Sequence, residues 1–97
     1  MKLKIKYLFP GIIELNSRDG DSGYDLRAHL AEPISIPAGE KRSFPTGIAA
    51  EVEGVPQGFD VELQVRPRSG HTNRGIVAQF GTIDSSYRGE IWVTIFN

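Results

Sequence analysis

The chain has 97 residues, a length that fits one domain with a modest hydrophobic core. Its 11 basic and 12 acidic side chains give a formal net charge of -1, which argues against a general electrostatic grip on nucleic acid or on an anionic membrane. It has no cysteine, so disulfides, thiolate nucleophiles and zinc–thiolate sites are excluded. No apolar run approaches the length of a membrane span, and a reducing cytoplasm is the expected location.

Short apolar runs between scattered glycines and prolines predict an all-β domain. In the first run Leu3, Ile5 and Tyr7 alternate with lysines, the pattern of a half-buried strand. Further strands are expected at residues 24–28, 34–36, 48–52, 59–65, 76–80 and 91–96. One helical turn is expected at residues 69–73, with Ser69 as its cap. Many short strands at near-regular spacing favour a sandwich or a barrel.

The last expected strand, residues 91–96, is strongly strand-forming and is followed only by Asn97. An exposed strand of this kind would be an aggregation hazard. Three arrangements would protect it: pairing with an earlier strand, cover by another chain, or a longer natural protein.

Three polar segments could carry chemistry, and the first surrounds Asp25. Gly23 allows a tight bend just before it, and Asp25 is expected in a strand whose neighbours point the other way. A strand aspartate facing a cleft could hold Mg²⁺ through water, because hard cations prefer oxygen ligands. The alternative is a loop aspartate that caps a turn.

The second segment is Arg66-Pro67-Arg68-Ser69-Gly70, where a proline ends a strand and a turn or helix begins. Free backbone N–H groups at such a start attract anions, Arg68 can bind phosphate through two donors, and Ser69 adds a hydroxyl. The alternative is a capping serine beside a solvated arginine.

The third segment, residues 81–91, is expected to form a hairpin that concentrates Asp84, Tyr87, Arg88 and Glu90. A carboxylate in a cleft can activate water as a general base, and the tyrosine could stack on or limit a sugar ring. Arg88 and Glu90 are expected to face the same side and pair. The alternative is a charged hairpin tip with a tyrosine covering the core.

Taken in this order, the three segments resemble the motifs of the trimeric deoxyuridine triphosphatase (dUTPase) family. The matching stretches are Ser22-Gly23-Tyr24-Asp25-Leu26, Pro67-Arg68-Ser69-Gly70, and Gly81-Thr82-Ile83-Asp84 with Tyr87-Arg88-Gly89-Glu90. Pro45-Thr46-Gly47-Ile48-Ala49 is also similar to the strand before the family's second motif.

The resemblance implies a jelly-roll-like β-barrel of the dUTPase-like β-clip type, with residues 1–97 as a single domain. It implies a homotrimer whose active sites are shared between subunits, and Mg²⁺-dependent hydrolysis of dUTP to dUMP and pyrophosphate. By position, Asp84 would direct the attacking water and contact the sugar 3′-hydroxyl, and Tyr87 would lie under the deoxyribose. Asp25 would act on the Mg²⁺–triphosphate through water. Arg68, Ser69 and Gly70 would hold phosphate, and backbone groups near Ala78, Gly81, Thr82, Ile83 and Tyr87 would read uracil.

The family's fourth and fifth motifs do not occur in this sequence, so the domain is expected to lack the family's last strands. This leaves a second interpretation open: a dUTPase-like nucleotide-binding or interaction module, truncated or split, without turnover on its own. A third interpretation is a dCTP deaminase-like protein on the same fold. The spacing of Asp84 and Tyr87, and the lack of an arginine three residues after Ser69, favour the uridine enzyme.

Overall fold

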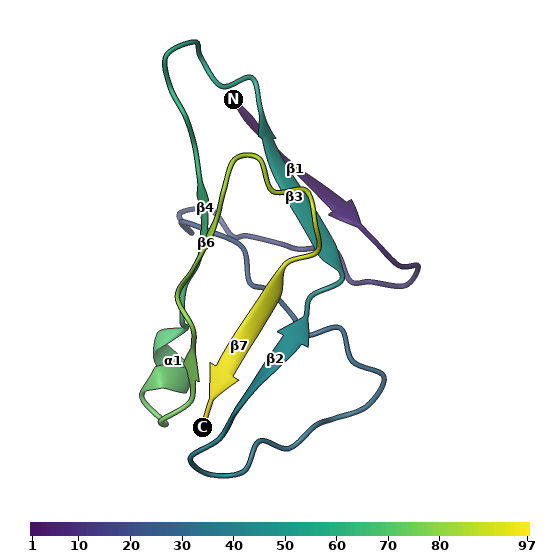
Figure 1. Ribbon diagram of the computed structural model, residues 1–97, viewed down its shortest axis with the longest axis vertical. Helices are drawn as coiled ribbons and strands as arrows, with labels where there is room; N and C mark the ends of the chain where they lie inside the picture. The colour runs from purple at the N-terminus through teal and green to yellow at the C-terminus, as the bar shows by residue number, and fades with distance from the viewer.

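The computed structural model describes residues 1–97 and contains seven strands and one short helix (Figure 1). In chain order they are β1 (Lys2–Tyr7), β2 (Lys41–Pro45), β3 (Ile48–Glu53), β4 (Leu63–Val65), α1 (Ser69–Thr72), β5 (Val77–Ala78), β6 (Gly81–Ile83) and β7 (Trp92–Phe96). The strands pair antiparallel in three sheets, ordered β1-β3, β2-β7-β5 and β4-β6. The all-β prediction is therefore confirmed, although the strands of this chain form separate sheets and not one closed barrel.

The predicted first strand is confirmed as β1, which lies beside β3 along its whole length. Leu3 and Ile5 are half-buried, whereas the intervening lysines are exposed, so the alternation predicted from sequence sets which face packs inward. Lys4 Nζ lies 3.0 Å from Glu53 Oε1 and 3.9 Å from Glu51 Oε1. The hydrogen bond to Glu53 and the charges of both carboxylates raise the pKa of Lys4 above 10.5.

The last strand, β7, has partners within the chain, which confirms the first of the three arrangements considered for it. It pairs with β2 on one side and with β5 on the other. Ser43 and Thr94 lie opposite each other, and their hydroxyls are 2.8 Å apart in a hydrogen bond. Trp92, on the same face as Thr94, remains 56% exposed.

The buried core is small and centres on the turn between β2 and β3. Of the 97 residues only six are buried: Phe44, Thr46, Gly47, Ile48, Ala49 and Ile91. The buried Thr46 hydroxyl donates to the Ile91 carbonyl at 2.6 Å, and the Ile91 N–H donates to the Ile48 carbonyl at 2.9 Å. These bonds join the start of β7 to the β2–β3 turn, so the core is fixed by polar as well as apolar contacts.

Four strand predictions are wrong in whole or in part. Residues 24–28 and 34–36 form no strand, of residues 59–65 only Leu63–Val65 does so, and of residues 76–80 only Val77–Ala78 does so. A strand needs a ladder partner, and no element of the chain pairs with the missing parts.

The helical turn is confirmed, but its N-cap is Arg68 and Ser69 is its first residue, so the predicted cap is wrong. No helix has the length and hydropathy required to cross a bilayer.

Candidate functional site

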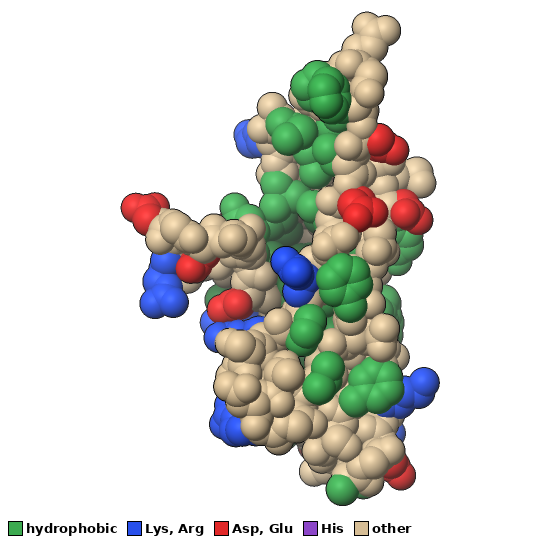
Figure 2. Space-filling view, turned by 90° about the vertical axis from the view of Figure 1, so that its left-hand side faces the viewer, with side chains coloured by type: hydrophobic (Ala, Val, Ile, Leu, Met, Phe, Trp, Pro, Cys, Tyr) green, Lys and Arg blue, Asp and Glu red, His purple; other side chains and the backbone are tan.

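A large cavity opens between the sheets. Its volume is about 770 Å³, and 17 of its 27 lining residues are hydrophobic. Residues of β1, β3, β4 and β7 form much of its wall, and residues 22–28 also line it. On the face that carries β4, β6 and α1, apolar side chains are exposed beside charged ones (Figure 2). The radius of gyration, 14.6 Å, exceeds the roughly 12.5 Å expected for a compact chain of this length. The cavity is thus an open interior between loosely covered sheets.

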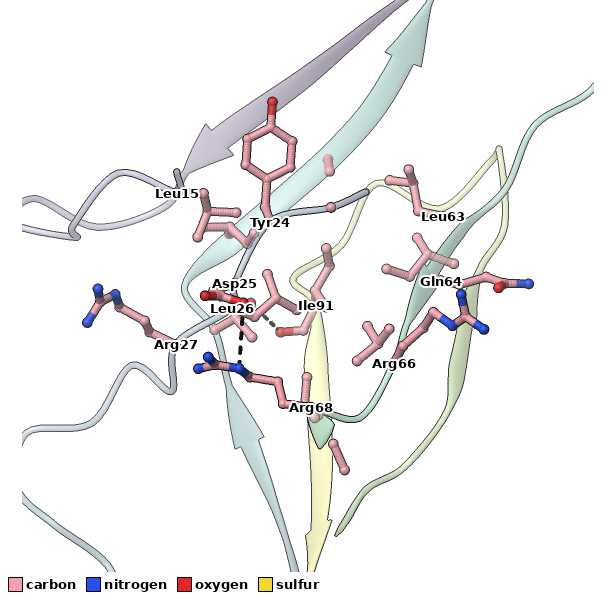
Figure 3. A pocket seen from close by; sticks show the side chains of 18 of the residues that line it. Leu15, Tyr24, Asp25, Leu26, Arg27, Leu63, Gln64, Arg66, Arg68 and Ile91 are labelled. Atoms are coloured by element: carbon pink, nitrogen blue, oxygen red, sulfur yellow. Dashed lines mark hydrogen bonds and ion pairs between the residues drawn. The ribbon is translucent and has the colours of Figure 1, made fainter. Parts of the chain in front are cut away.

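Asp25 and Arg68 meet at the edge of this cavity. Figure 3 shows their side chains pointing toward each other, while Arg27 and Arg66 point away. Arg68 Nε lies 3.7 Å from Asp25 Oδ1, and both side chains are about two-thirds exposed, at 64% and 68%. An exposed ion pair of this length contributes little stability, at most about 1 kcal/mol. Breaking this ion pair therefore costs little free energy, so Asp25 and Arg68 can each bind another charged partner instead.

Asp25 differs in one respect from its sequence-based description, because it lies in an irregular segment and not in a strand. The structure contains no group of three or more His, Cys, Asp or Glu side chains placed to hold a metal, so Asp25 belongs to no such group. Mg²⁺ is commonly held by one or two carboxylates together with substrate phosphates. A single carboxylate beside an arginine that could bind phosphate fits that donor set.

Ser69 and Gly70 follow Arg68 at the start of α1. Both are exposed, and the Ser69 hydroxyl has no hydrogen-bond partner. Thr72 Oγ1 and the Thr72 N–H donate to the Arg68 carbonyl, each at 3.0 Å, and hold the turn closed. The first N–H groups of a helix have no partner inside the helix, so this end presents free donors next to the Arg68 guanidinium.

Residues 81–91 do not form the expected hairpin. β6 pairs with β4, whereas β7 pairs with β2 and β5, so residues 84–90 form a loop between two sheets. We refer to these residues as the 84–90 loop. It begins with a tight turn in which the Tyr87 N–H donates to the Asp84 carbonyl at 3.0 Å. The Asp84 carboxylate is exposed and makes no hydrogen bond or ion pair, which leaves it free to accept from water or ligand.

The ring of Tyr87 is fixed by its own loop. Its hydroxyl donates to the Glu90 carbonyl at 2.6 Å, and the ring lies directly over Gly89. A Cβ at position 89 would lie 2.6 Å from Tyr87 Oη and 2.8 Å from Cζ. Only glycine therefore lets the ring take this position, in which it is 45% exposed.

Gly89→Ala should displace the Tyr87 ring and break its bond to the Glu90 carbonyl. Gly89 has no positive φ, so the backbone itself accepts alanine and the effect comes from the ring contact. The expected loss is about 1 kcal/mol of unfolding free energy in urea denaturation, with a shift of the Tyr87 ring resonances. Gly23→Ala, where nothing lies within 4 Å and φ is also not positive, should stay within about 0.5 kcal/mol of wild type. Equal values for the two variants would contradict the ring contact.

Two carboxylates anchor the 84–90 loop, and neither anchor was predicted. Arg88 pairs with Glu51 of β3, with Nε 3.0 Å from Oε2, and the predicted Arg88–Glu90 pair is wrong. Glu90 Oε2 instead accepts from the Gly47 N–H at 2.8 Å. Glu51 and Gly47 are distant in sequence from the loop, so no local spacing signalled them.

The predicted site residues fall into two groups in one chain. Asp25, Arg68, Ala78 and Ile83 line the large cavity, whereas Asp84 and Tyr87 lie outside it on the 84–90 loop. In Figure 1 α1 lies near the lower end of the molecule and this loop in the upper half, so Ser69 and Gly70 are well separated from Asp84. Gly81 and Thr82 lie on β6 opposite Val65 and Gln64 of β4. The other edge of β6 has no strand partner, which leaves backbone donors and acceptors unpaired there.

The sequence matches the family model for dUTPase over residues 10–97. This chain belongs to the dUTPase family. It is 51% identical to the deoxyuridine 5'-triphosphate nucleotidohydrolase of Chlamydia pneumoniae over 80% of this chain and 52% of the relative. It is 38% identical to that of Bdellovibrio bacteriovorus over 100% of this chain and 65% of the relative. The chain thus spans about half the length of the first of these dUTPases and just under two thirds of the second.

Solved dUTPase structures share the fold. The dUTPase of phage phi11 of S. aureus, solved as a mutant that revealed coordination of a structural Mg(II) ion, aligns with a TM-score of 0.79. That alignment has 27% sequence identity and covers 100% of this chain and 60% of the phage chain. The dUTPase of Staphylococcus bacteriophage 80alpha aligns over 97% of this chain with a TM-score of 0.75. The predicted jelly-roll-like all-β fold is confirmed.

Proposed function

We propose that this dUTPase-family chain takes part in the hydrolysis of dUTP to dUMP and pyrophosphate. The observation that carries the proposal is the family match over residues 10–97, which includes all three motifs. The proposal is also supported by two chemical features of the chain, the free carboxylate of Asp84 and the exchangeable Asp25–Arg68 ion pair.

The phosphate end of the site would lie at the Asp25–Arg68 edge. Arg68 would leave Asp25 and bind phosphate oxygens through two donors, while the Ser69 hydroxyl and the Gly70 N–H add neutral donors. Asp25 would face the Mg²⁺–triphosphate through water, and Mg²⁺ would supply charge neutralisation of the phosphates when bound. A few placed donors suit a chain whose formal net charge is only -1.

The base and sugar end would lie at β6 and the 84–90 loop. Unpaired backbone groups near Ala78 and along β6 would read the donor and acceptor edge of uracil. Tyr87 would lie under the deoxyribose, where its fixed ring leaves no room for a 2′-hydroxyl. Asp84 would accept a proton from the attacking water, which is the work of a general base, and would also contact the 3′-hydroxyl.

A complete site would need more than one copy of this chain, or further chain segments. In one chain Arg68, Ser69 and Gly70 lie at the start of α1, well separated from Asp84 and Tyr87 on the 84–90 loop, which supports the proposal that a homotrimer shares its active sites between subunits. A cytoplasmic location and a single domain over residues 1–97 remain predictions.

The second candidate is a dUTPase-like nucleotide-binding or interaction module that does not turn over alone. The open cavity and the small core favour it, because they expose apolar interior that additional polypeptide would cover. This module would bind a uracil nucleotide, or associate with another chain, without hydrolysing dUTP.

The two candidates are separated by one set of measurements on the purified protein. The protein is mixed with dUTP and Mg²⁺, and pyrophosphate is assayed, with dCTP as the comparison substrate. Turnover of dUTP but not of dCTP is the expected result. Binding of a non-hydrolysable dUTP analogue by calorimetry, without turnover, would favour the module. Failure of binding and turnover, with a monomer in size analysis, would overturn both.

A further inference from the structure

The Arg88 guanidinium binds both the backbone of the 84–90 loop and a residue outside this loop. Its Nη1 donates to the Ser85 carbonyl at 2.6 Å and to the Tyr87 carbonyl at 3.2 Å. Its Nε faces Glu51 Oε2 at 3.0 Å. One planar group therefore ties the backbone between Asp84 and Tyr87 to a residue of β3.

Glu51 is itself held in place by its neighbours. It lies opposite Lys4 in the β1–β3 ladder, and Lys4 Nζ is 3.9 Å from Oε1, whereas Arg88 binds the other carboxylate oxygen, Oε2. The Glu51 side chain is only 34% exposed. Two cations, one at each oxygen, and a paired strand beneath give this carboxylate a defined position.

The loop has little else to order it. Residues 84–89 are all exposed, and none belongs to a strand or helix. A segment with so few buried contacts opens readily unless polar anchors restrain it. Besides Glu51, the anchor that links the loop to the body is the Glu90 bond to the Gly47 N–H.

We propose that Glu51 is a positioning residue that sets the placement of Asp84 and Tyr87 through Arg88. The importance of this placement for chemistry rests on the proposed function. The restraint of the loop by Glu51 does not rest on it, so the two can be tested apart.

The test uses Glu51→Gln, which keeps the shape of the side chain and removes its charge. The matched control is Glu53→Gln, because Glu53 lies on the same strand, binds Lys4 at 3.0 Å and does not contact Arg88. The first measurement is hydrogen exchange of the Tyr87 and Gly47 N–H groups, by NMR and without nucleotide. We expect exchange about tenfold faster in Glu51→Gln, a loss of roughly 1.4 kcal/mol of protection, and no change in Glu53→Gln.

The second measurement is the ratio of kcat/KM for dUTP to that for UTP. A misplacement of about 1 Å can lower a rate by about 10²-fold, so we expect kcat/KM for dUTP to fall by about 10- to 100-fold in Glu51→Gln. The ratio should fall as well, because a displaced Tyr87 no longer excludes the 2′-hydroxyl. A mere loss of stability would lower both rates together and leave the ratio unchanged.

Arg88→Gln tests whether Glu51 acts through Arg88. If it does, the double variant Glu51→Gln/Arg88→Gln should lose no more exchange protection and no more kcat/KM than Arg88→Gln alone. Additive losses, or exchange rates in Glu51→Gln equal to wild type, would overturn the proposal. A wild-type protein that neither binds nor hydrolyses dUTP would overturn the proposed function, while the exchange measurement would still decide the role of Glu51.

Discussion

Asp84→Asn should abolish dUTP hydrolysis and leave the fold intact. If Asp84 is the general base, its loss lowers kcat by about 10²- to 10⁴-fold. Asparagine keeps a carbonyl oxygen that can accept from the 3′-hydroxyl, so binding of a non-hydrolysable dUTP analogue should be nearly unchanged. An effect on kcat without an effect on binding is the signature of an interaction made only in the transition state.

The Asp84 carboxylate has no hydrogen-bond or ion-pair partner in the protein, so an effect on turnover can be separated from an effect on stability. Its replacement should change the free energy of unfolding by no more than about 0.5 kcal/mol. Asp19→Asn is the matched control, since Asp19 is also an exposed aspartate without a hydrogen bond or ion pair, and it lies in a different loop. Pyrophosphate release measured for the three proteins should show loss in Asp84→Asn alone. Equal turnover in all three would remove Asp84 from the mechanism.

The strands that the sequence predicted correctly are those whose pattern suffices to define them. In β1 the alternation of lysine with Leu3, Ile5 and Tyr7 fixes both the strand and its buried face, and in β7 a continuous β-branched and aromatic run defines the strand. Residues 24–28 have a similar local composition but no ladder partner. Strand formation depends on a partner elsewhere in the chain, and a single segment does not reveal whether one exists.

The site shows the same division between local and long-range information. Asp25, Arg68, Asp84 and Tyr87 were predicted as site residues from motifs, because each motif is a short run of residues. The pairing of Arg88 was not, since the two-residue spacing to Glu90 indicates a shared face only in a strand, and the 84–90 loop is irregular. Only the folded chain brings Glu51 beside Arg88.

Gly47→Ala should be among the most destabilising single substitutions in this chain. Gly47 is buried and has a φ of +71°, a conformation that costs an alanine about 1–2 kcal/mol. A Cβ there would also lie 2.5 Å from Ile12 Cδ1 and 3.3 Å from His29 Cγ. Overpacking of this kind adds about 1–3 kcal/mol.

Gly47 connects three parts of the chain through hydrogen bonds. The substitution can therefore weaken these bonds as well as create a steric clash. The Gly47 N–H donates to Glu90 of the 84–90 loop, and its carbonyl accepts from the Leu8 N–H at 2.8 Å. A backbone shift that relieves the clash would lengthen one of these bonds, whereas a rotation of the Ile12 side chain would leave them intact. We therefore expect the variant to lose about 2–5 kcal/mol of unfolding free energy and to show faster exchange at Tyr87.

Two further variants separate the backbone cost of Gly47→Ala from its contact cost. Gly58 has a φ of +86°, and a Cβ at this position would have nothing within 4 Å, so Gly58→Ala should show the backbone cost alone, about 1–2 kcal/mol in urea denaturation. In an Ile12→Ala background, where the closest contact is gone, the cost of Gly47→Ala should approach that of Gly58→Ala. If Gly47→Ala cost no more than Gly58→Ala in the wild-type background, the contact with Ile12 would carry no energy.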